Sequence, residues 1–514
     1  MTRPKVRLCF DPSKGPCLGA VIDTRGIPDG TVLDTDLAII GGGPAGISLA
    51  LALADTPIKV LLLEGGGQTL DQDMQALYEG RSSGVKYLTL EGSRIRSLGG
   101  STYHWGGWCR PLDETDFEKR DWLPYSGWPF SRKELDPYLP RAQQLVEAGT
   151  WFYDEAGKHV SDDLLPVADG GVYTSWYQDS KTRNDIIPTN FGTRYRADLT
   201  AAKNITVYYH ANVTGIRLSP DAKRVDKLDL ATLTGKKAAV RAKYVVLAAG
   251  ALENARLLLA SNDVAKAGVG NQNDLVGRFF ADHPIPRDTA TLVSFSGELP
   301  AFYFSWTQIT GAVVRTTFAP TVDYMRKNNL LCSLTTVENP VAMNEVDTAA
   351  VVATSQALGV NASYAKAYSL GCGLEMAPDP ERRLTLTGER DALGLPKLTL
   401  AVTISDMGFD HYRQTMKEFG RQLLAARSGM IRLNLGERDA WLKNMDWASH
   451  HLGTTRMHVD PKQGVVDANS AVHGMANLFV AGGSVFPTYG ASNPTLNLIA
   501  MTLRLGDYIK KLFA

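Results

Sequence analysis

The chain is poor in cysteine and has no net charge. Its 54 basic and 54 acidic residues cancel, so the excess of positive charge that nucleic-acid binding requires is missing. The few cysteines have neither CxxC nor other metal-ligand spacing, and an odd, sparse set fits a reducing compartment better than a disulfide framework. These cysteines are Cys9, Cys17, Cys109, Cys332 and Cys372.

Long apolar runs are also missing, and none approaches the roughly 18 residues that a membrane-spanning helix needs. The N-terminal stretch MTRPKVRLCFDPSKGPCLG is basic but lacks the continuous apolar segment of a secretory signal. We therefore expect a soluble, cytoplasmic protein with no nucleic-acid partner and no membrane span. With 514 residues, of which 44% are apolar, the chain is long enough for two domains.

Residues 36–64, DLAIIGGGPAGISLALALADTPIKVLLLE, carry a complete dinucleotide-binding pattern. An apolar strand leads into Gly41, Gly43 and Gly46, and a helix and a second strand follow, ending at Glu64. The glycines permit a tight turn, a close approach of backbone to pyrophosphate and close helix–strand packing. The helix start favours phosphate. Glu64 is placed to accept hydrogen bonds from a ribose diol, which argues against a 2′-phosphorylated dinucleotide.

A second unit helps to separate FAD from NAD, which the first pattern leaves open. Residues 243–260, KYVVLAAGALENARLLLA, predict a buried strand that turns at Gly250 into a helix. They follow a hairpin-like pair of strands, in which Val213 is a candidate neighbour of adenine, with an ordinary core valine as the alternative. Such an antiparallel excursion before a second strand–turn–helix unit is typical of FAD-dependent folds. The sequence therefore favours FAD.

Two further segments are rich in glycine and lack regular periodicity. Residues 93–139 contain LGGSTYHWGGW, whose glycines suggest backbone that passes close to a planar or phosphorylated group. The aromatic residues of the segment are explained equally well by loop packing, so composition leaves the question even. Residues 447–514 contain HHLGTTRM, then a short strand that ends in Gly482 and Gly483, a second place where backbone could meet a cofactor. A helix opening, Ser-Asn-Pro-Thr at 492–495, follows. The residues alone do not decide whether either adjacent histidine does chemistry.

The order of these motifs resembles the glucose–methanol–choline (GMC) oxidoreductase family. The matching stretches are GGGPAG…LLLEGG, LGGSTYHWGGW, VVLAAGALENARLLL and HHLGTTRM…LFVAGGSVFP…SNPTLN. The loop and C-terminal signatures are most similar to the bacterial pyranose-oxidase and glycoside-3-oxidase branch. The resemblance implies an α/β fold. A Rossmann-like FAD domain, of the p-hydroxybenzoate-hydroxylase-like type, would adjoin an α+β substrate domain built on an antiparallel sheet.

The resemblance also implies roles for individual residues. Alcohol oxidation needs a base for the hydroxyl proton as hydride leaves carbon for flavin N5, and a second polar group to hold the hydroxyl. In the family the base is the histidine of His-x-x-Gly-Thr, which here is His450, and its partner at the last helix start is Asn493. His104 falls where some relatives attach FAD covalently, and simple packing on the flavin is the alternative. The expected FAD contacts are Gly41, Gly43, Gly46, Glu64, Gly99, Gly100, Ser101, His104, Val213, Gly250, Gly482, Gly483, Pro494 and Thr495. We expect no metal site.

Two of these assignments have plain structural alternatives. Asn493 could serve only as a helix cap, although Ser492 is available for that task. His451 should point away from His450 if the stretch is extended, because successive side chains of a strand alternate faces. That geometry makes His451 a supporting or packing residue, whereas a turn would let it reach the substrate.

The expected FAD domain is discontinuous and comprises residues 34–150, 190–288 and 446–514. The substrate domain would comprise residues 151–189 and 289–445, with strands and with helices near 347–369 and 407–427. The aromatic segment 151–178 is a candidate lid or sugar-stacking loop, with plain packing equally open. VGRFFADHP, residues 276–284, resembles a family stretch but receives no chemical role.

The resulting hypothesis is an FAD-dependent enzyme that oxidises a secondary hydroxyl of a pyranose or glycoside to a ketone. Oxygen, giving hydrogen peroxide, or a quinone-type acceptor would reoxidise the flavin, and the sequence does not separate oxidase from dehydrogenase. One alternative is another alcohol, such as an aminoglycoside primary hydroxyl or a polyol. A second is an NAD-binding protein without flavin chemistry. The ring position and the oligomeric state stay open.

Overall fold

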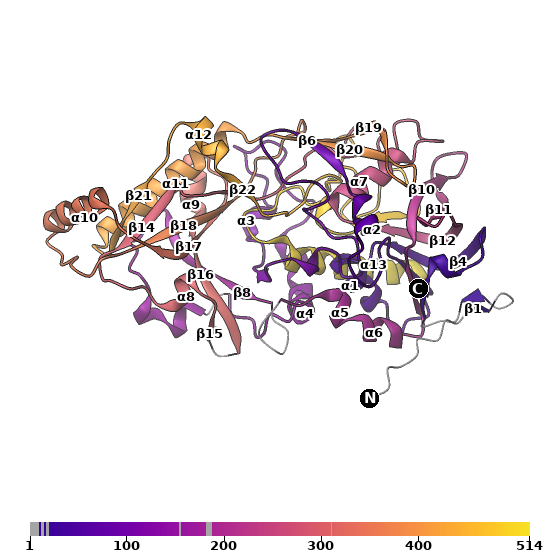
Figure 1. Cartoon of the computed structure of the whole chain (residues 1–514), viewed down its shortest axis with the longest axis horizontal. Coiled ribbons are helices and arrows are strands. Elements are labelled where there is room, and N and C mark those ends of the chain that lie inside the picture. The colour runs from indigo at the N-terminus through magenta and orange to yellow at the C-terminus, as the bar shows by residue number, and fades with distance from the viewer. Residues whose placement is uncertain (1–9, 12–14, 17–19, 154–155, 181–187, 310) are drawn as a thin grey trace.

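The computed structural model describes residues 10–11, 15–16, 20–153, 156–180, 188–309 and 311–514. Cys9, Cys17 and most of the N-terminal stretch lie outside these residues. The molecule is elongated, and two halves lie side by side along its long axis (Figure 1). The remaining cysteines are buried and free, and they are Cys109, Cys332 and Cys372.

The first half is built on a sheet whose inner strands are parallel, with an antiparallel hairpin at one edge. Parallel strands buried on both faces read as continuous apolar runs, and residues 37–40 and 60–63 are such runs. The predicted excursion is present and joins the sheet at its edge. In spatial order the strands are β10 (Asn212–Leu218), β11 (Val225–Ala231), β12 (Lys237–Leu247), β4 (Thr31–Ile40), β5 (Val60–Leu63), β9 (Ile205–Tyr209) and β3 (Val21–Asp23), with β23 (Leu478–Val480) parallel to β12.

Three helices that follow strands of this sheet start at its carboxyl end. Helix α1 (Pro44–Ala52) follows β4, α7 (Ala251–Ala260) follows β12, and α13 (Pro494–Phe513) ends the chain. Their N-caps are Gly43, Gly250 and Asn493, and none of the three caps with a side chain. Ligands of open α/β sheets bind at the carboxyl ends of strands, so the geometry of this half predicts where its site lies.

The second half is an antiparallel sheet covered by helices, as predicted. Its strands in spatial order are β21 (Gly429–Leu433), β14 (Ala290–Ser294), β18 (Lys366–Leu374), β17 (Ser333–Val341), β16 (Ala312–Pro320), β8 (Val172–Asp179) and β7 (Trp108–Cys109), with β15 (Thr307–Ile309) beside β16. The amphipathic helix α11 (Asp406–Ala425) packs against it, and its buried residues recur at helical spacing. The α/β fold with an antiparallel second domain is confirmed.

One predicted helix is shorter than expected. Helix α10 (Glu345–Leu358) ends at Gly359, which takes the left-handed conformation with φ of 65°. Residues near 366, expected to be helical, instead begin β18 in the centre of the second sheet. The left-handed region favours glycine and closes a helix at its C-terminus, and this stop accounts for the early end.

Two smaller sheets connect segments that lie far apart in the sequence. Strand β6 (Gly80–Gly84) pairs with β20 (Pro396–Val402), which in turn pairs with β19 (Leu384–Arg390). Part of the span expected in the substrate domain thus pairs with a strand of the nucleotide half. Strand β13 (Pro284–Pro286) pairs with β22 (Met445–Trp447). This second pairing lies immediately beside the two adjacent histidines.

The remaining elements are short, and none of the described helices is both long and apolar enough to cross a membrane. They are β1 (Phe10–Asp11), β2 (Gly15–Pro16), α2 (Gln72–Ala76), α3 (Glu114–Phe117), α4 (Leu139–Leu145), α5 (Phe191–Arg194), α6 (Arg196–Ala201), α8 (Ala301–Phe304), α9 (Val322–Asn328) and α12 (Arg438–Lys443).

Candidate active site

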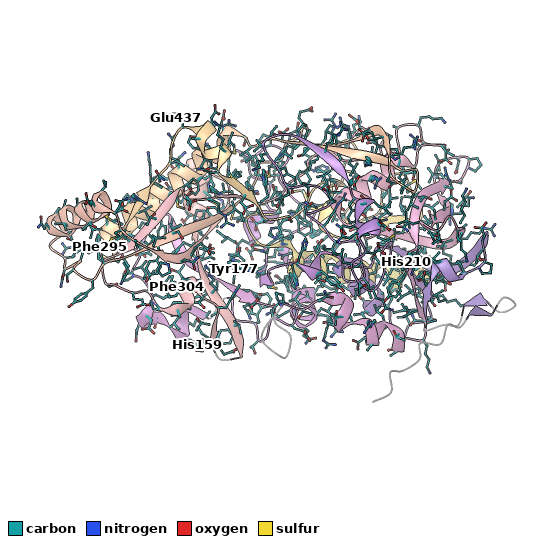
Figure 2. All side chains as sticks on the ribbon, in the orientation of Figure 1. His159, Tyr177, His210, Phe295, Phe304 and Glu437 are labelled. Carbon is teal, nitrogen blue, oxygen red and sulfur yellow. The ribbon has the colours of Figure 1, made fainter. Side chains whose placement is uncertain are left out.

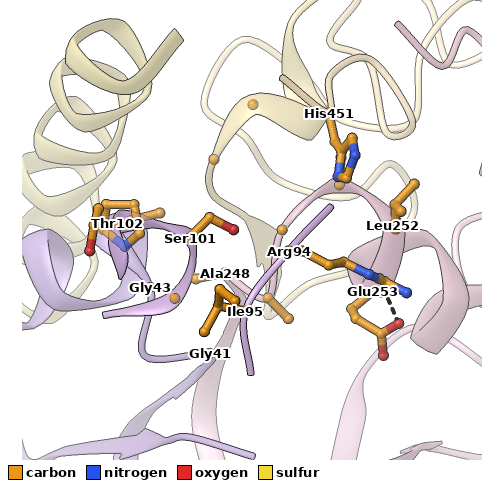
Figure 3. A pocket seen from close by; sticks show the side chains of 18 of the residues that line it. Gly41, Gly43, Arg94, Ile95, Ser101, Thr102, Ala248, Leu252, Glu253 and His451 are labelled. Atoms are coloured by element: carbon orange, nitrogen blue, oxygen red, sulfur yellow. Dashed lines mark hydrogen bonds and ion pairs between the residues drawn. The ribbon is translucent and has the colours of Figure 1, made fainter. Parts of the chain in front are cut away.

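A cavity of about 320 Å³ lies where the strands of the first sheet end and the three helices begin. Most residues predicted to contact a cofactor line it, together with both members of the predicted catalytic pair. Figure 3 shows Gly41, Gly43, Ser101 and Ala248 on its nucleotide side, opposite His451. The predicted residues that line it are Gly41, Gly43, Glu64, Gly100, Ser101, His104, Val213, Gly250, His450, Gly482, Gly483, Asn493, Pro494 and Thr495.

Gly46 and Gly99 do not line the cavity, but both have a packing reason to be glycine. A Cβ atom at Gly46 would lie 1.9 Å from the carbonyl oxygen of Gly41, so α1 could not pack against the turn before it. Gly99 has φ of 100°, and a Cβ there would lie 2.6 Å from the backbone nitrogen of Gly192. These two glycines let the backbone around the cavity pack closely, although neither of them lines the cavity.

Glu64 is held by the turn that it faces. One carboxylate oxygen accepts the backbone N–H of Gly42 at 2.7 Å, and the other accepts that of Gly66 at 2.6 Å. The side chain is buried yet lines the cavity. Each carboxylate oxygen has a second lone pair, so Glu64 can still accept hydrogen bonds from the hydroxyls of a ribose.

A cluster of buried charges lines the same side, and the sequence reasoning assigned no role to it. Glu253 pairs with Arg94 at 2.9 Å (Figure 3) and with Arg96 at 3.8 Å. Arg96 also donates to Asn212 at 2.8 Å, beside Val213. Nearby guanidinium groups lower the pKa of Glu253 against the effect of burial. The sequence feature that could have indicated this cluster is the pair of arginines in SRIRSLGG, two residues apart ahead of the glycines.

The opposite side of the cavity carries His450 and Asn493. The amide Nδ2 of Asn493 lies 3.3 Å from Nε2 of His450, and both residues line the cavity. Burial lowers the pKa of His450 well below its usual value, and His283 and His451 lower it further. The imidazole is therefore neutral at physiological pH, as a general base must be.

Asn493 is the N-cap residue of α13, yet its side chain makes no capping hydrogen bond. Ser492 does not cap the helix either. The Ser492 hydroxyl donates to the Pro111 carbonyl and accepts from Arg110. Pro494 occupies the first helical turn and needs no N–H partner. The amide of Asn493 is thereby left for the cavity.

Two residues that sequence reasoning passed over hold His450 in place. Asp282 accepts the backbone N–H of His450 at 2.7 Å. His283 lies with its Nδ1 atom 2.8 Å from Nδ1 of His450. Both come from VGRFFADHP, where two polar residues end an apolar stretch. That local pattern was the available signal, and the pairing of β13 with β22 brings it to the site.

His451 also lines the cavity, so the expectation from strand alternation does not describe this stretch. Ser449 has φ of 59°, and the chain turns there. The His451 ring packs against Phe280 and Tyr87, with centroid distances of 5.8 Å and 6.4 Å. Its buried Nε2 atom has no partner among the described residues. Burial lowers the pKa of His451 to about 3.

Aromatic side chains border the cavity towards the second half. Trp108 lines it, and its ring centroid lies 5.1 Å from that of Tyr177 and 5.0 Å from that of Trp306. Tyr177 lies closer to the nucleotide half than Phe295 or Phe304 (Figure 2). The described part of the candidate lid, 151–178, contributes no residue to the cavity lining. Trp108, from the glycine-rich loop, lies where that segment was expected.

Comparisons with known proteins agree with this geometry. Residues 338–502 match the family model described as GMC oxidoreductase, and residues 36–266 match that described as FAD dependent oxidoreductase. Together these matches contain the end of β4, all of α1, β12 and α7, and both members of the His450–Asn493 pair. The chain is a GMC oxidoreductase. It is an FAD-dependent enzyme of that family.

Curated relatives of this GMC oxidoreductase match it over nearly its whole length. The C-glycoside 3-oxidase of Microbacterium trichothecenolyticum is 26% identical, over 92% of this chain and 96% of its own. The fructose dehydrogenase large subunit of Gluconobacter japonicus is 23% identical, over 93% of this chain and 98% of its own. The 6'''-hydroxyparomomycin C oxidase of Streptomyces lividus is 24% identical, over 91% and 90%.

Solved structures share the fold. Pyridoxine 4-oxidase of Mesorbium loti superposes with a TM-score of 0.55 at 19% identity, covering 93% of this chain and 99% of that one. A formate oxidase superposes with a TM-score of 0.58 at 17% identity, covering 95% and 99%.

The cavity of this GMC oxidoreductase fits FAD by its own chemistry. The backbone at Gly43 faces open space, since a Cβ there would meet nothing within 4 Å. The N-termini of α1, α7 and α13 favour negative charge. Arg96 offers a buried Nε atom that has no partner among the described residues. Glu64 and Arg96 would hold the adenosine side of FAD, and the start of α13 would face the flavin side.

Proposed function

We propose that the enzyme oxidises a secondary hydroxyl of a pyranose or glycoside to a ketone. His450 is the base in this proposal, and Asn493 holds the substrate hydroxyl. Bound FAD would supply the hydride acceptor, and oxygen, giving hydrogen peroxide, or another acceptor would reoxidise it. The observation that carries the proposal is the approach of Asn493 Nδ2 to His450 Nε2, at 3.3 Å, on the surface of the cofactor cavity.

The two side chains divide the work. FAD, when bound, supplies the acceptor for the hydride that leaves the carbon. His450 takes the hydroxyl proton at Nε2, the nitrogen nearest Asn493, and its lowered pKa keeps the imidazole neutral and able to accept a proton. The amide of Asn493 donates to the same hydroxyl oxygen and thereby fixes the direction of the C–H bond. The buried rings of Phe280 and Tyr87 pack against His451.

A sugar is supported by the wall of the cavity and by the relatives. The Trp108 ring offers an aromatic surface, and aromatic rings pack on the C–H faces of sugars. The names of the relatives include a C-glycoside 3-oxidase, a pyranose 2-oxidase and a fructose dehydrogenase. Covalent attachment of FAD through His104, which lines the cavity, stays a prediction.

The test is anaerobic flavin bleaching with a panel of pyranoses, glycosides, aminoglycosides and polyols. We expect the fastest bleaching with a pyranose or glycoside and a ketosugar as product, identified by mass spectrometry. Faster bleaching by a polyol or an aminoglycoside would favour the second candidate function, the oxidation of another alcohol. Two relatives support that candidate: 2-methyl-1,2-propanediol dehydrogenase of Mycolicibacterium austroafricanum and 6'''-hydroxyparomomycin C oxidase. Mixing the reduced enzyme with oxygen or with a quinone identifies the acceptor.

A further inference from the structure

His283 lies behind His450, and hydrogen bonding fixes where its own proton resides. The side chain is 2% exposed. Its Nε2 atom lies 3.0 Å from the carbonyl oxygen of Gly490. A carbonyl can only accept a hydrogen bond, so Nε2 of His283 must carry a proton.

The second nitrogen of His283 is therefore unprotonated as long as the ring is neutral. Burial lowers the pKa of His283 to about 4, which keeps it neutral at physiological pH. The two Nδ1 atoms of His283 and His450 lie 2.8 Å apart and share one proton. Since His283 cannot supply it, the proton belongs to Nδ1 of His450.

We propose that His283 is a positioning residue that fixes His450 in its Nδ1–H tautomer. The unprotonated Nε2 of His450 then faces Asn493 and the cavity, where the substrate hydroxyl must give up its proton. The tautomer of a histidine is set by the hydrogen bond that its other nitrogen makes. This inference rests on the proposed function of His450 as the base.

The surroundings hold His283 in the orientation that this role requires. The Asp282 carboxylate accepts the backbone N–H of His283 at 2.7 Å. The Tyr489 ring packs edge-on at 5.3 Å between centroids. Gly490 has φ of 52°, and Asp116 fills the space that a side chain at this position would need. The ionisable groups around the two rings are Asp282, Glu375, His451 and Tyr489.

A matched pair of variants separates the acceptor at this position from its bulk. Asparagine and leucine have nearly the same shape, but only asparagine offers an oxygen where Nδ1 of His283 lies. The main measurement is ¹⁵N NMR of histidine-labelled holoenzyme without substrate, with His450 signals identified by their loss in His450→Gln. We expect an Nδ1–H tautomer in the wild type and in His283→Asn, and an Nε2–H tautomer in His283→Leu.

Flavin reduction provides the second measurement. A wrong tautomer has a large effect on a histidine base, so we expect His283→Leu to reduce flavin at least ~100-fold more slowly. His283→Asn should recover at least ~10-fold of that loss. An Nε2–H tautomer of His450 in the wild type would overturn the inference, even if His283→Leu fails to bind FAD. An unchanged tautomer in His283→Leu would overturn it as well. If His450→Ala keeps its rate, the proposed function fails instead, whatever the tautomers are.

Discussion

The carboxylate of Asp282 accepts the backbone N–H of His450 at 2.7 Å, although 168 residues separate the two in the chain. The same oxygen accepts the N–H of His283, and the other accepts the Tyr87 hydroxyl at 2.5 Å. Asp282→Ala would leave three buried donors without an acceptor, each costing about 1–3 kcal/mol. We expect a clearly lower urea midpoint and loss of flavin reduction. Asp282→Asn, which keeps an acceptor, should lose much less of both.

The same carboxylate predicts a pH dependence of stability. Burial raises the pKa of Asp282 from 3.8 to about 6. A raised pKa means that the folded protein binds the proton more tightly than the unfolded chain. The stability that Asp282 contributes therefore falls as pH rises from about 4 to about 6. The urea midpoint of the wild type minus that of Asp282→Asn should fall over this interval and then level off. A constant difference from acid to neutral pH would contradict the assignment.

The adjacent histidines should differ strongly in their effect on catalysis. His450→Ala should slow flavin reduction by about 10³-fold while FAD stays bound, because a positioned base contributes about 10²–10⁴-fold. His451→Ala, which removes packing against Phe280, should slow it by less than about 10-fold. Because the pKa of His450 is lowered, the rate should stay constant as pH falls through 6.5 and decline only in more acidic solution. Stopped-flow absorbance measures the rates of flavin reduction of both variants and the dependence of the rate on pH. The reverse ranking of the two variants would refute the choice of base.

Asn493 offers a test of chemistry against capping. Asn493→Ala should slow flavin reduction about 10²-fold, as a misplaced substrate does. It should leave the thermal midpoint unchanged, since the side chain makes no capping bond. Asn344, the N-cap of α10, is the matched control because its side chain accepts the N–H of Asp347 at 2.8 Å. Asn344→Ala should cost about 1 kcal/mol of stability with normal catalysis. Equal destabilisation by the two variants would return Asn493 to a capping role.

Glu64 should govern the affinity for FAD. Loss of a hydrogen bond to a charged acceptor costs about 1.5–3 kcal/mol, so the Kd of Glu64→Ala for FAD should rise about 10–100-fold. Fluorescence quenching of FAD by the apoprotein measures this. At saturating FAD the variant should have the wild-type rate of flavin reduction, because Glu64 is expected to hold the adenosine side of FAD. A normal Kd would mean that Glu64 only supports the glycine turn.

Trp108 should act on substrate binding. Trp108→Ala should raise the KM for the best sugar about 10-fold with a smaller change in kcat, because it removes stacking area and leaves the base in place. Trp108→Phe, which keeps a ring, should recover most of the affinity. A loss confined to kcat would argue against a binding role.

Local patterns allowed most of the nucleotide half to be predicted. Gly41, Gly43 and Glu64 act within one strand–helix–strand unit, so their spacing in the sequence already specifies their geometry. His450 and Asn493 were recognised from family motifs, and each motif is short. The sequence did not indicate the residues whose place depends on contacts between distant segments. His283 acquires its place only through the pairing of β13 with β22, and no pattern in VGRFFADHP specifies that partner.

The helix predicted near 347–369 shows a second limit. A stretch rich in alanine and valine suits either helix or strand, and Gly359 followed by β18 decided between them. The pairing of β20 with β6 depends likewise on a contact between distant segments. Interior strands of a sheet are selected by their neighbours as much as by their own residues.

The order of assembly follows from the position of the last elements. Strand β23 completes the sheet that β4 began, and Leu49 and Ala52 of α1 pack against Gly506 of α13. The first βαβ unit therefore gains its full set of neighbours only when β23 and α13, far along the chain, have joined it. A chain that stops before α13 would lack the wall of the cavity that Asn493, Pro494 and Thr495 supply.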